Sequence, residues 1–176
     1  PTAFFRLLQT LGAAKKLWPA ITRLDRLEQL SQHTDKPEYR FAALFVEIPM
    51  AATQQLAKAL KAPNRYTELA VMTSQAYLTW LALPTLDSNA ILAFFQQLDG
   101  FRRQARFQQF MHLSALLARA DIDHAPARQA AWQQLYASGA SVTAADVAAD
   151  LQGPAISQAI KTLQLAKIEA TLATIK

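Results

Sequence analysis

Apolar residues recur at every third or fourth position along most of the chain, which is the spacing of helices that bury one face. In ITRLDRLEQLSQ, for example, this spacing puts Leu24, Leu27 and Leu30 on the same face. No run of Val, Ile and Thr alternates with polar residues in the manner typical of strands. The pattern therefore predicts an all-α fold, with a multi-helix body followed by a small helical tail.

Start and stop signals divide this pattern into separate helices. Gly12 and Gly100 each end a predicted helix, and Pro37 and Pro154 fall in first turns. Asn64 caps a long helix, and Asp87 or Ser88 starts another. The predicted helices cover residues 2–11, 21–32, 37–49, 50–61, 65–82, 90–99, 101–120, 127–138 and 155–175.

The linker SGASVTAADV separates the predicted body from the predicted tail. In it, Thr143 and Asp146 have the spacing of a capping box at the start of a short helix. We expect the body to span residues 1–138 and the tail residues 139–176. Because the chain begins with PTAFFRLLQT and not with Met, we also expect it to be a piece of a longer protein.

Composition narrows the classes of protein. Of the 176 residues, 52% are hydrophobic and 18% are charged, which indicates a packed globular chain. Cysteine is absent, which excludes disulfides, thiolate metal sites and Cys nucleophiles and favours a cytoplasmic location. The apolar stretches are too short to span a bilayer, so we expect no membrane partner.

The net charge of +5 is unevenly distributed along the chain. Residues 1–119 contain 14 Lys and Arg against 8 Asp and Glu, whereas residues 120–176 contain 4 against 5. A basic N-terminal two-thirds favours a polyanionic partner. A cationic surface that only keeps the protein in solution explains the same charge, and both interpretations stay open.

The segment LDGFRRQARFQQF holds the densest basic group. A helix over it puts Arg102, Arg103 and Arg106 on adjoining rows, with Asp99 close enough to pair. Phosphate fits the planar fork of a guanidinium group, so the three arginines are candidate nucleic-acid ligands. The alternative is an Asp99–Arg network that fixes the helix to its neighbour, and the two interpretations are compatible.

A second basic group lies around KAPNR and contains Lys58, Lys61 and Arg65. Cations near a helix C-terminus are favoured by the helix dipole, so capping alone would explain the two lysines. A third set of cations without acids between them reads as a solvated face by default: Arg6, Lys15, Lys16 and Arg23.

Catalytic chemistry finds little support in the sequence. None of His33, His112 and His124 has a His or carboxylate partner three or four residues on, so we expect solvated or core histidines. Asp121 and Asp123 have the spacing of a two-metal pair, but they fall in a helix-to-helix turn with no sheet or Gly-rich loop beside them. We therefore predict no catalytic residue and no metal ligand.

Five segments, in order, resemble the C-terminal region of the bacterial CCA-adding tRNA nucleotidyltransferase and poly(A) polymerase family. The likeness covers nearly the whole chain, and its Pro-Asn, Asp-x-x-Arg and Gly-Pro motifs are fairly specific in combination. The segments are LLQTLGAAKKLWPAITRL, PEYRFAALF, LAKALKAPNRYTELA, LDSNAILAFFQQLDGFRRQARFQQF and LQGPAISQAIKTLQLAKI.

The resemblance implies that this region holds the acceptor and TΨC arm of tRNA by phosphate and shape contacts. An N-terminal catalytic head of the same chain, absent here, would use Mg²⁺, CTP and ATP to add C, C and A. In the tail, Gln152, Gly153 and Lys161 become RNA-binding candidates, because the helix that starts at Pro154 presents backbone N–H groups.

The resemblance also bears on RFAALFVEIP, residues 40–49. Family members with metal-dependent phosphohydrolase activity have a His-Asp pair where this chain has Val46 and Glu47. One acid without histidines cannot complete a metal coordination shell. We expect the phosphohydrolase site to be degenerate and Glu47 to be a solvated or helix-end residue.

Two alternative functions stay open. The longer protein to which this chain belongs is either a CCA-adding enzyme or the related bacterial poly(A) polymerase. From another class, the chain is a helical interaction domain that does not bind RNA. The direction of Arg102, Arg103 and Arg106, outward to solvent or inward to acids, discriminates between RNA binding and this last alternative.

Overall fold

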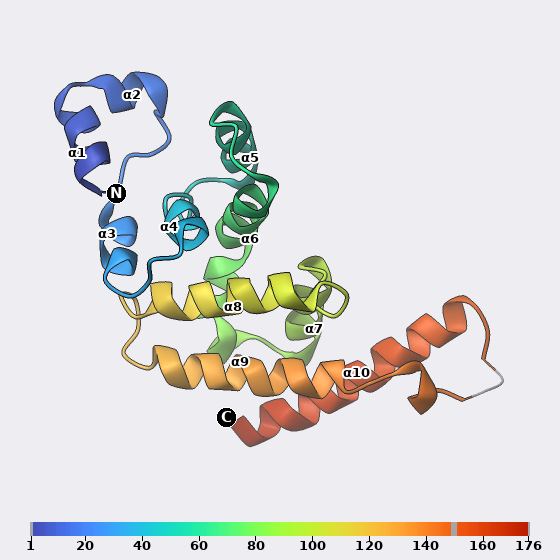
Figure 1. The fold of residues 1–176 in the computed structure, drawn as a ribbon. Helices are drawn as coiled ribbons and strands as arrows, with labels where there is room; N and C mark the ends of the chain where they lie inside the picture. Colours follow the sequence, from blue (N-terminus) through green and yellow to red (C-terminus); the bar gives the residue numbers. More distant parts are fainter. Residues whose placement is uncertain (1, 149–150, 176) are drawn as a thin grey trace. The chain divides into compact units, whose positions relative to one another are not determined.

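The computed structural model describes residues 2–148 and 151–175, and within them the chain is helical with no strand. The predicted all-α class is confirmed. Figure 1 shows the helices, which have the following bounds. They are α1 (Thr2–Thr10), α2 (Ala13–Leu17), α3 (Asp25–Ser31), α4 (Pro37–Ala43), α5 (Met50–Ala59), α6 (Asn64–Leu81), α7 (Ser88–Gln97), α8 (Gln104–Ala118), α9 (Ala125–Ala140) and α10 (Pro154–Ile175), with 3₁₀ turns η1 (Leu83–Thr85) and η2 (Ala144–Asp146).

The chain forms two compact units. The first unit comprises Pro1–Leu81 and Gln108–Ala125, and the second comprises Ala82–Phe107 and Pro126–Lys176. The predicted boundary between residues 138 and 139 lies within α9. The division into a body and a tail stays a prediction.

Several helix ends follow from local signals, as predicted. Gly12 takes the left-handed conformation after α1, with φ of 68°. The Asp87 carboxylate accepts a hydrogen bond of 2.7 Å from the Ala90 N–H at the start of α7. Thr143 and Asp146 form the predicted capping box, although it caps only the turn η2.

The predicted helix over residues 37–49 is wrong in its second half, because α4 ends at Ala43. The chain continues in turns, with hydrogen bonds of 3.0 Å from the Phe45 N–H to the Ala42 carbonyl and from the Ile48 N–H to the Phe45 carbonyl. Pro49 disfavours a helical residue before it. Leu44, Phe45, Val46 and Ile48 are all buried, and a helix turns successive side chains by about 100°, so one helical face could not bury the first three.

A second correction concerns the basic segment after Gly100. The helix predicted from residue 101 begins at Gln104, so Arg102 and Arg103 precede α8 and do not share a helical face with Arg106. Asp99 is left-handed, with φ of 54°, and closes α7. The turn that follows stacks the Phe101 ring on Tyr136, with 5.7 Å between centroids.

In the first unit, α4 and α5 pack on α6, and α3 packs on α4. Its fully buried side chains include Leu27, Tyr39, Phe45, Tyr77 and Trp80. Large apolar side chains removed from water are the main source of the folding free energy. None of the described helices has the length and apolar character that a membrane crossing needs.

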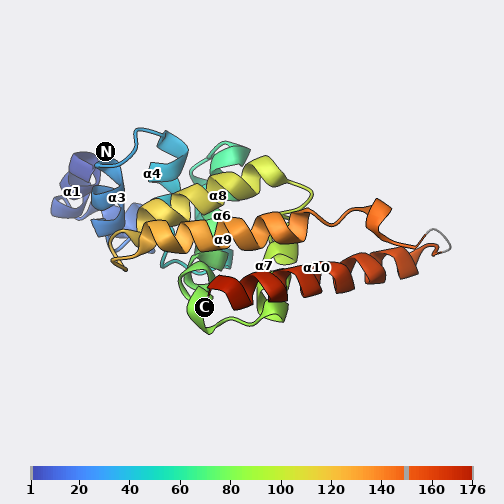
Figure 2. The ribbon, with the colours of Figure 1, turned by 90° about the horizontal axis from the view of Figure 1, so that it is seen from below.

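In the second unit, α10 packs against α7, as Figures 1 and 2 show. Aromatic rings fill its interior: Phe94 lies 4.7 Å from Trp132 and Phe107 lies 4.9 Å from Tyr136, measured between centroids. The Tyr136 hydroxyl donates to the Gly100 carbonyl at 3.0 Å. This hydrogen bond ties α9 to the turn that carries the basic segment.

Gly139 allows its neighbours in the second unit to pack closely, because it has no side chain. A Cβ atom at this position would lie 3.1 Å from Phe101 Cζ and 3.2 Å from Ile168 Cδ1.

We expect Gly139→Val to lower the free energy of unfolding by about 2 kcal/mol, because overpacking displaces buried side chains. Urea unfolding measures the change. Ala137→Val, at an exposed position of the same helix, serves as the control and should cost about 0.5 kcal/mol. Equal losses in the two variants would contradict the packing argument.

Candidate nucleic-acid interface

Asp99 gathers the arginines of the basic segment in the second unit. Arg102 donates to its carboxylate from Nε at 3.1 Å and from Nη2 at 2.5 Å, and Arg103 Nε lies 3.6 Å away. Arg106 instead donates from Nη2 to the Leu98 carbonyl at 3.1 Å. The structure therefore brings the three predicted arginines to one turn.

The ion pairs of this group lie at an exposed position. Hydrogen bonds from Arg102 hold the pKa of the Asp99 carboxyl below its usual value, and the same contact raises the pKa of Arg102. The side chains of Arg102 and Arg103 are 74% and 45% exposed, whereas Arg106 is half-buried. The Asp99 carboxylate thus lies beside two guanidinium groups that are open to solvent, those of Arg102 and Arg103. Both interpretations of the segment, an Asp99 network and an exposed cationic surface, describe part of it.

The second predicted group lies in the first unit, where α5 gives way to α6. Lys58 is in the last turn of α5, and Lys61 is left-handed with φ of 49°, as at a helix C-terminus. The Arg65 guanidinium carbon lies 5.3 Å from the centroid of the Tyr66 ring. All three cations are exposed, and none forms an ion pair with a described residue.

The tail candidates lie at the start of α10. Gly153 is left-handed, with φ of 57°, and Gln152 and Lys161 are exposed. The Ala155 and Ile156 N–H groups already donate to the Gln152 and Gly153 carbonyls, at 3.3 and 3.2 Å. Pro154 has no N–H. This helix start therefore presents fewer free donors than the sequence suggests.

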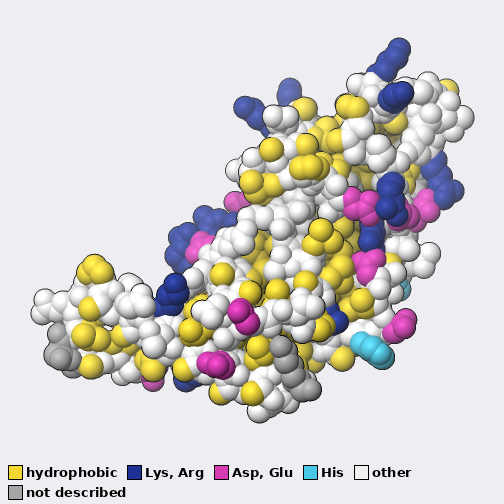
Figure 3. Space-filling model, turned by 180° about the vertical axis from the view of Figure 1, so that it is seen from behind, with side chains coloured by type: hydrophobic (Ala, Val, Ile, Leu, Met, Phe, Trp, Pro, Cys, Tyr) yellow, Lys and Arg dark blue, Asp and Glu magenta, His cyan; other side chains and the backbone are white. Residues whose placement is uncertain are grey.

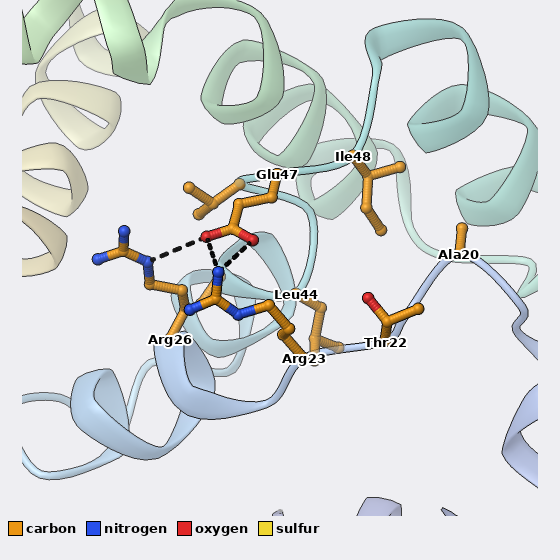
Figure 4. A pocket seen from close by; sticks show the side chains of 9 residues that line it. Ala20, Thr22, Arg23, Arg26, Leu44, Glu47 and Ile48 are labelled. Atoms are coloured by element: carbon orange, nitrogen blue, oxygen red, sulfur yellow. Dashed lines mark hydrogen bonds and ion pairs between the residues drawn. The ribbon is translucent and has the colours of Figure 1, made fainter.

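An ion-pair network that the sequence does not reveal surrounds Glu47 in the first unit. Figure 4 shows Arg23 and Arg26 converging on this carboxylate. Arg23 Nη1 donates to both of its oxygens, at 3.1 and 3.0 Å, and Arg26 Nε lies 3.9 Å away. With its side chain 44% exposed, Glu47 is solvated, as predicted, but it follows α4 in a turn and has two arginine neighbours.

The network continues to acids on either side. Arg23 also pairs with Asp25, at 2.7 Å between Nη2 and Oδ2, and this hydrogen bond raises the pKa of Arg23. Arg26 Nη1 lies 2.6 Å from Oδ1 of Asp121, whose other oxygen accepts a hydrogen bond from the Tyr77 hydroxyl. Burial, followed by the Asp121 contact, raises the pKa of Tyr77. Arg26 and Asp121, far apart in the sequence, thereby fix two chain segments to each other.

These contacts bear on the chemistry of the cavity drawn in Figure 4, which has a volume of about 110 Å³ and is lined by Thr22, Arg23, Arg26 and Glu47 among others. Guanidinium groups neutralise its carboxylate. Among the described residues, no group of three or more His, Cys, Asp or Glu side chains is placed to hold a metal ion. Asp121 lies in the predicted turn, bound to Arg26, and the three histidines are exposed.

Figure 3 shows one face of the molecule, on which Lys and Arg side chains reach the solvent, some of them beside Asp and Glu side chains. The contacts described above show which of the basic groups have carboxylate partners. Arg23 and Arg26 have carboxylate partners, Arg102 and Arg103 share one, and Lys58, Lys61 and Arg65 have none among the described residues. The last group is therefore the most available to an anionic partner.

Curated proteins similar to this chain are named CCA-adding enzyme or multifunctional CCA protein. The multifunctional CCA protein of Pseudomonas putida is 30% identical over 180 residues, which cover 97% of this chain and 48% of the relative. The CCA-adding enzyme of Coxiella burnetii is 32% identical over 122 residues, 67% of this chain and 32% of the relative. The multifunctional CCA protein of Xanthomonas campestris is 33% identical over 127 residues, 68% of this chain and 30% of the relative.

The chain thus spans a half or less of the length of these relatives. No known family profile matches the chain. No solved structure matches it either.

The Arg26–Asp121 pair should contribute more to stability than the exposed pair of Arg23. We expect Arg26→Met, which keeps the apolar stem, to lower the free energy of unfolding by about 1–3 kcal/mol, because it leaves Asp121 short of a positive partner. Arg23→Met is the control and should cost less than about 1 kcal/mol, since that side chain is 61% exposed. Chemical denaturation measures both, and a larger loss for Arg23→Met would contradict the assignment.

Acid should weaken the fold in part through Asp99. A carboxyl whose pKa is depressed in the folded state adds stability above its unfolded pKa of 3.8, and this stability is lost as the pH falls through the folded pKa. We expect the unfolding midpoint of Asp99→Asn to fall less than that of the parent chain between about pH 5 and pH 2. Asp123→Asn, which removes an exposed acid without an ion pair among the described residues, is the control. Parallel curves for Asp99→Asn and the parent would refute the expectation.

Proposed function

Because this chain belongs to the family of CCA-adding enzymes and multifunctional CCA proteins, in which it corresponds to the C-terminal region, we propose that it is the tRNA-binding part of a CCA-adding tRNA nucleotidyltransferase. It holds the acceptor and TΨC arm while an N-terminal head of the same chain adds C, C and A. Mg²⁺, CTP and ATP act in that head, which belongs to the part of the relatives that this chain does not span.

The exposed, unpaired cations of the first unit are the observation that carries this proposal. Double-stranded RNA has a deep, narrow major groove that side chains cannot read, so proteins hold it mainly through phosphates and 2′-hydroxyl groups. Lys58, Lys61 and Arg65 display three positive charges at the junction of α5 and α6, and no described acid neutralises them. This arrangement suits the sugar–phosphate backbone of RNA.

The second unit adds contacts of the same kind. Arg102 and Arg103 are exposed and both lie beside the Asp99 carboxylate, and exposed ion pairs of this kind are weak enough for a phosphate to compete with them. Arg106 supports this turn through the Leu98 carbonyl. Gln152, Gly153 and Lys161 are the RNA-binding residues proposed at the start of α10, and Lys161 is the charged one.

Some members of the resembled family have a phosphohydrolase site, and we propose that this chain has lost its activity. Glu47, where their metal-binding acid stands, is held by Arg23, and a guanidinium group repels a divalent cation. The chain therefore contributes binding and not catalysis. The names of the relatives favour CCA addition over the poly(A) polymerase alternative. The unpaired cations favour RNA binding over an interaction domain without it.

Binding should depend strongly on salt. If about four phosphates are neutralised, the logarithm of the affinity for a tRNA minihelix should fall against the logarithm of salt concentration with a slope of about −3 to −4. In the triple variant Lys58→Ala, Lys61→Ala, Arg65→Ala we expect this slope to become shallower by about 2 to 3. Fluorescence anisotropy of a labelled minihelix, titrated at several salt concentrations, measures the slope.

The matched control for this experiment keeps the charges and changes the side chains. Lys58→Arg, Lys61→Arg, Arg65→Lys should retain the slope of the parent chain, because the counterion term depends on charge. A flat salt response of the parent, or an alanine variant that binds as the parent does, would overturn the proposed function.

A further inference from the structure

An aromatic cavity lies beside the Lys58, Lys61 and Arg65 group in the first unit. Its volume is about 340 Å³, and its walls include Phe5, Trp18, Phe41 and Tyr66. A second cavity of about 310 Å³ adjoins the first, with Phe5, Phe41 and Tyr66 lining both. We propose that this aromatic cavity receives the base of an unpaired nucleotide whose phosphate is held by Lys61. The proposal rests on the proposed function, because it takes the polyanionic partner to be RNA.

The rings are arranged in two pairs that come from different helices. Phe5 of α1 packs against Trp18, which follows α2, with 5.5 Å between centroids. Phe41 of α4 packs edge to face on Tyr66 of α6, with 5.8 Å between centroids. All four rings are half-buried, whereas most other aromatic residues of the chain are buried. Partly exposed rings that border one cavity offer a flat ligand π-faces on more than one side.

The charges around the cavity select an anionic ligand. Lys61 lines the first cavity and Arg40 lines the second, and no acidic side chain lines either. The charge of Arg40 is met by Asp35, at 2.7 Å, but Lys61 has no ion pair with a described residue. The Arg65 guanidinium carbon lies 5.3 Å from the centroid of the Tyr66 ring, which lines both cavities. A nucleotide combines a stacking face with a negative phosphate, and this combination fits both features.

The apolar lining predicts how the cavity would discriminate. Stacking on aromatic side chains is worth about 1–3 kcal/mol per base and tolerates any base, since each has a π-face. The walls other than Lys61 and Arg40 are mainly apolar, so we expect little preference among bases. A fully paired duplex keeps its bases stacked inside and cannot enter, so the cavity selects unpaired nucleotides.

The test uses a short single-stranded RNA that carries one 2-aminopurine, whose fluorescence falls when it stacks. Mixed with the chain, this RNA should lose emission. The tryptophan emission of the protein should fall in parallel. This change reports on Trp18, because Trp80 and Trp132 are fully buried and out of reach of the RNA. Tyr66→Ala should weaken binding by about 5- to 160-fold, and Tyr66→Phe, which keeps the ring, should bind as the unsubstituted chain does. In Trp18→Phe, the 2-aminopurine emission should still fall on binding, whereas the tryptophan emission of the protein should no longer change.

Folding of Tyr66→Ala is checked by circular dichroism and thermal unfolding, because Tyr66 also packs on Phe41. Should that variant unfold, Lys61→Ala, at an exposed position, replaces it and should weaken binding while the unfolding midpoint stays unchanged.

A blunt-ended minihelix in a parallel titration separates the two proposals. If the minihelix binds and 2-aminopurine emission does not change, the cavity proposal is wrong and the proposed function stands. If emission falls and the minihelix does not bind, the cavity is a nucleotide site and the proposed function fails. If the RNA is not quenched and a longer chain with the remaining length of the relatives shields Trp18 from iodide, the cavity holds protein, which also overturns the inference.

Discussion

Two guanidinium groups at the start of α3 join segments of the first unit that lie far apart in the sequence. Arg26 binds Asp121, which also accepts a hydrogen bond from Tyr77, and Arg23 binds Glu47 in the turn after α4. A charge left without its partner in a partly buried site costs more than an intact pair contributes. Segments remote in the sequence are therefore fixed relative to α3. Tyr77 belongs to α6, and Glu47 follows α4, so the contacts link α3 to both helices that border the aromatic cavity.

The same constraint explains why arginine and lysine residues have different parts in this chain. Arg23, Arg26 and Arg40 meet carboxylates, so their charge is spent on the fold. Lys58, Lys61 and Arg65 meet no described acid, so their charge is directed to solvent and to any anionic partner. A net charge of +5 does not distinguish the two kinds, because it counts all of them equally.

Residues with local effects were predictable. Gly12 after α1, Asp87 before α7 and Pro154 at the start of α10 act on backbone groups within four positions, so their roles can be read from the sequence. The errors arose where packing overrode the local pattern. Residues 44–48 leave the helix to bury adjacent side chains, and the turn before Gln104 places Phe101 against Tyr136. Arg102 and Arg103 were thereby moved off the predicted helical face.

By itself, the sequence determined the helical class, most helix ends, the excess of positive charge and the likeness to a family, since each depends on neighbouring residues or on composition. The tertiary structure alone decided which cations are neutralised, that Glu47 lies against Arg23, and that Phe5, Trp18, Phe41 and Tyr66 border one cavity. Ion pairs and cavities join atoms that are close in space and distant in sequence. Helical periodicity carries no information about such pairs, because it repeats within a few residues and the path of the chain between helices sets the rest.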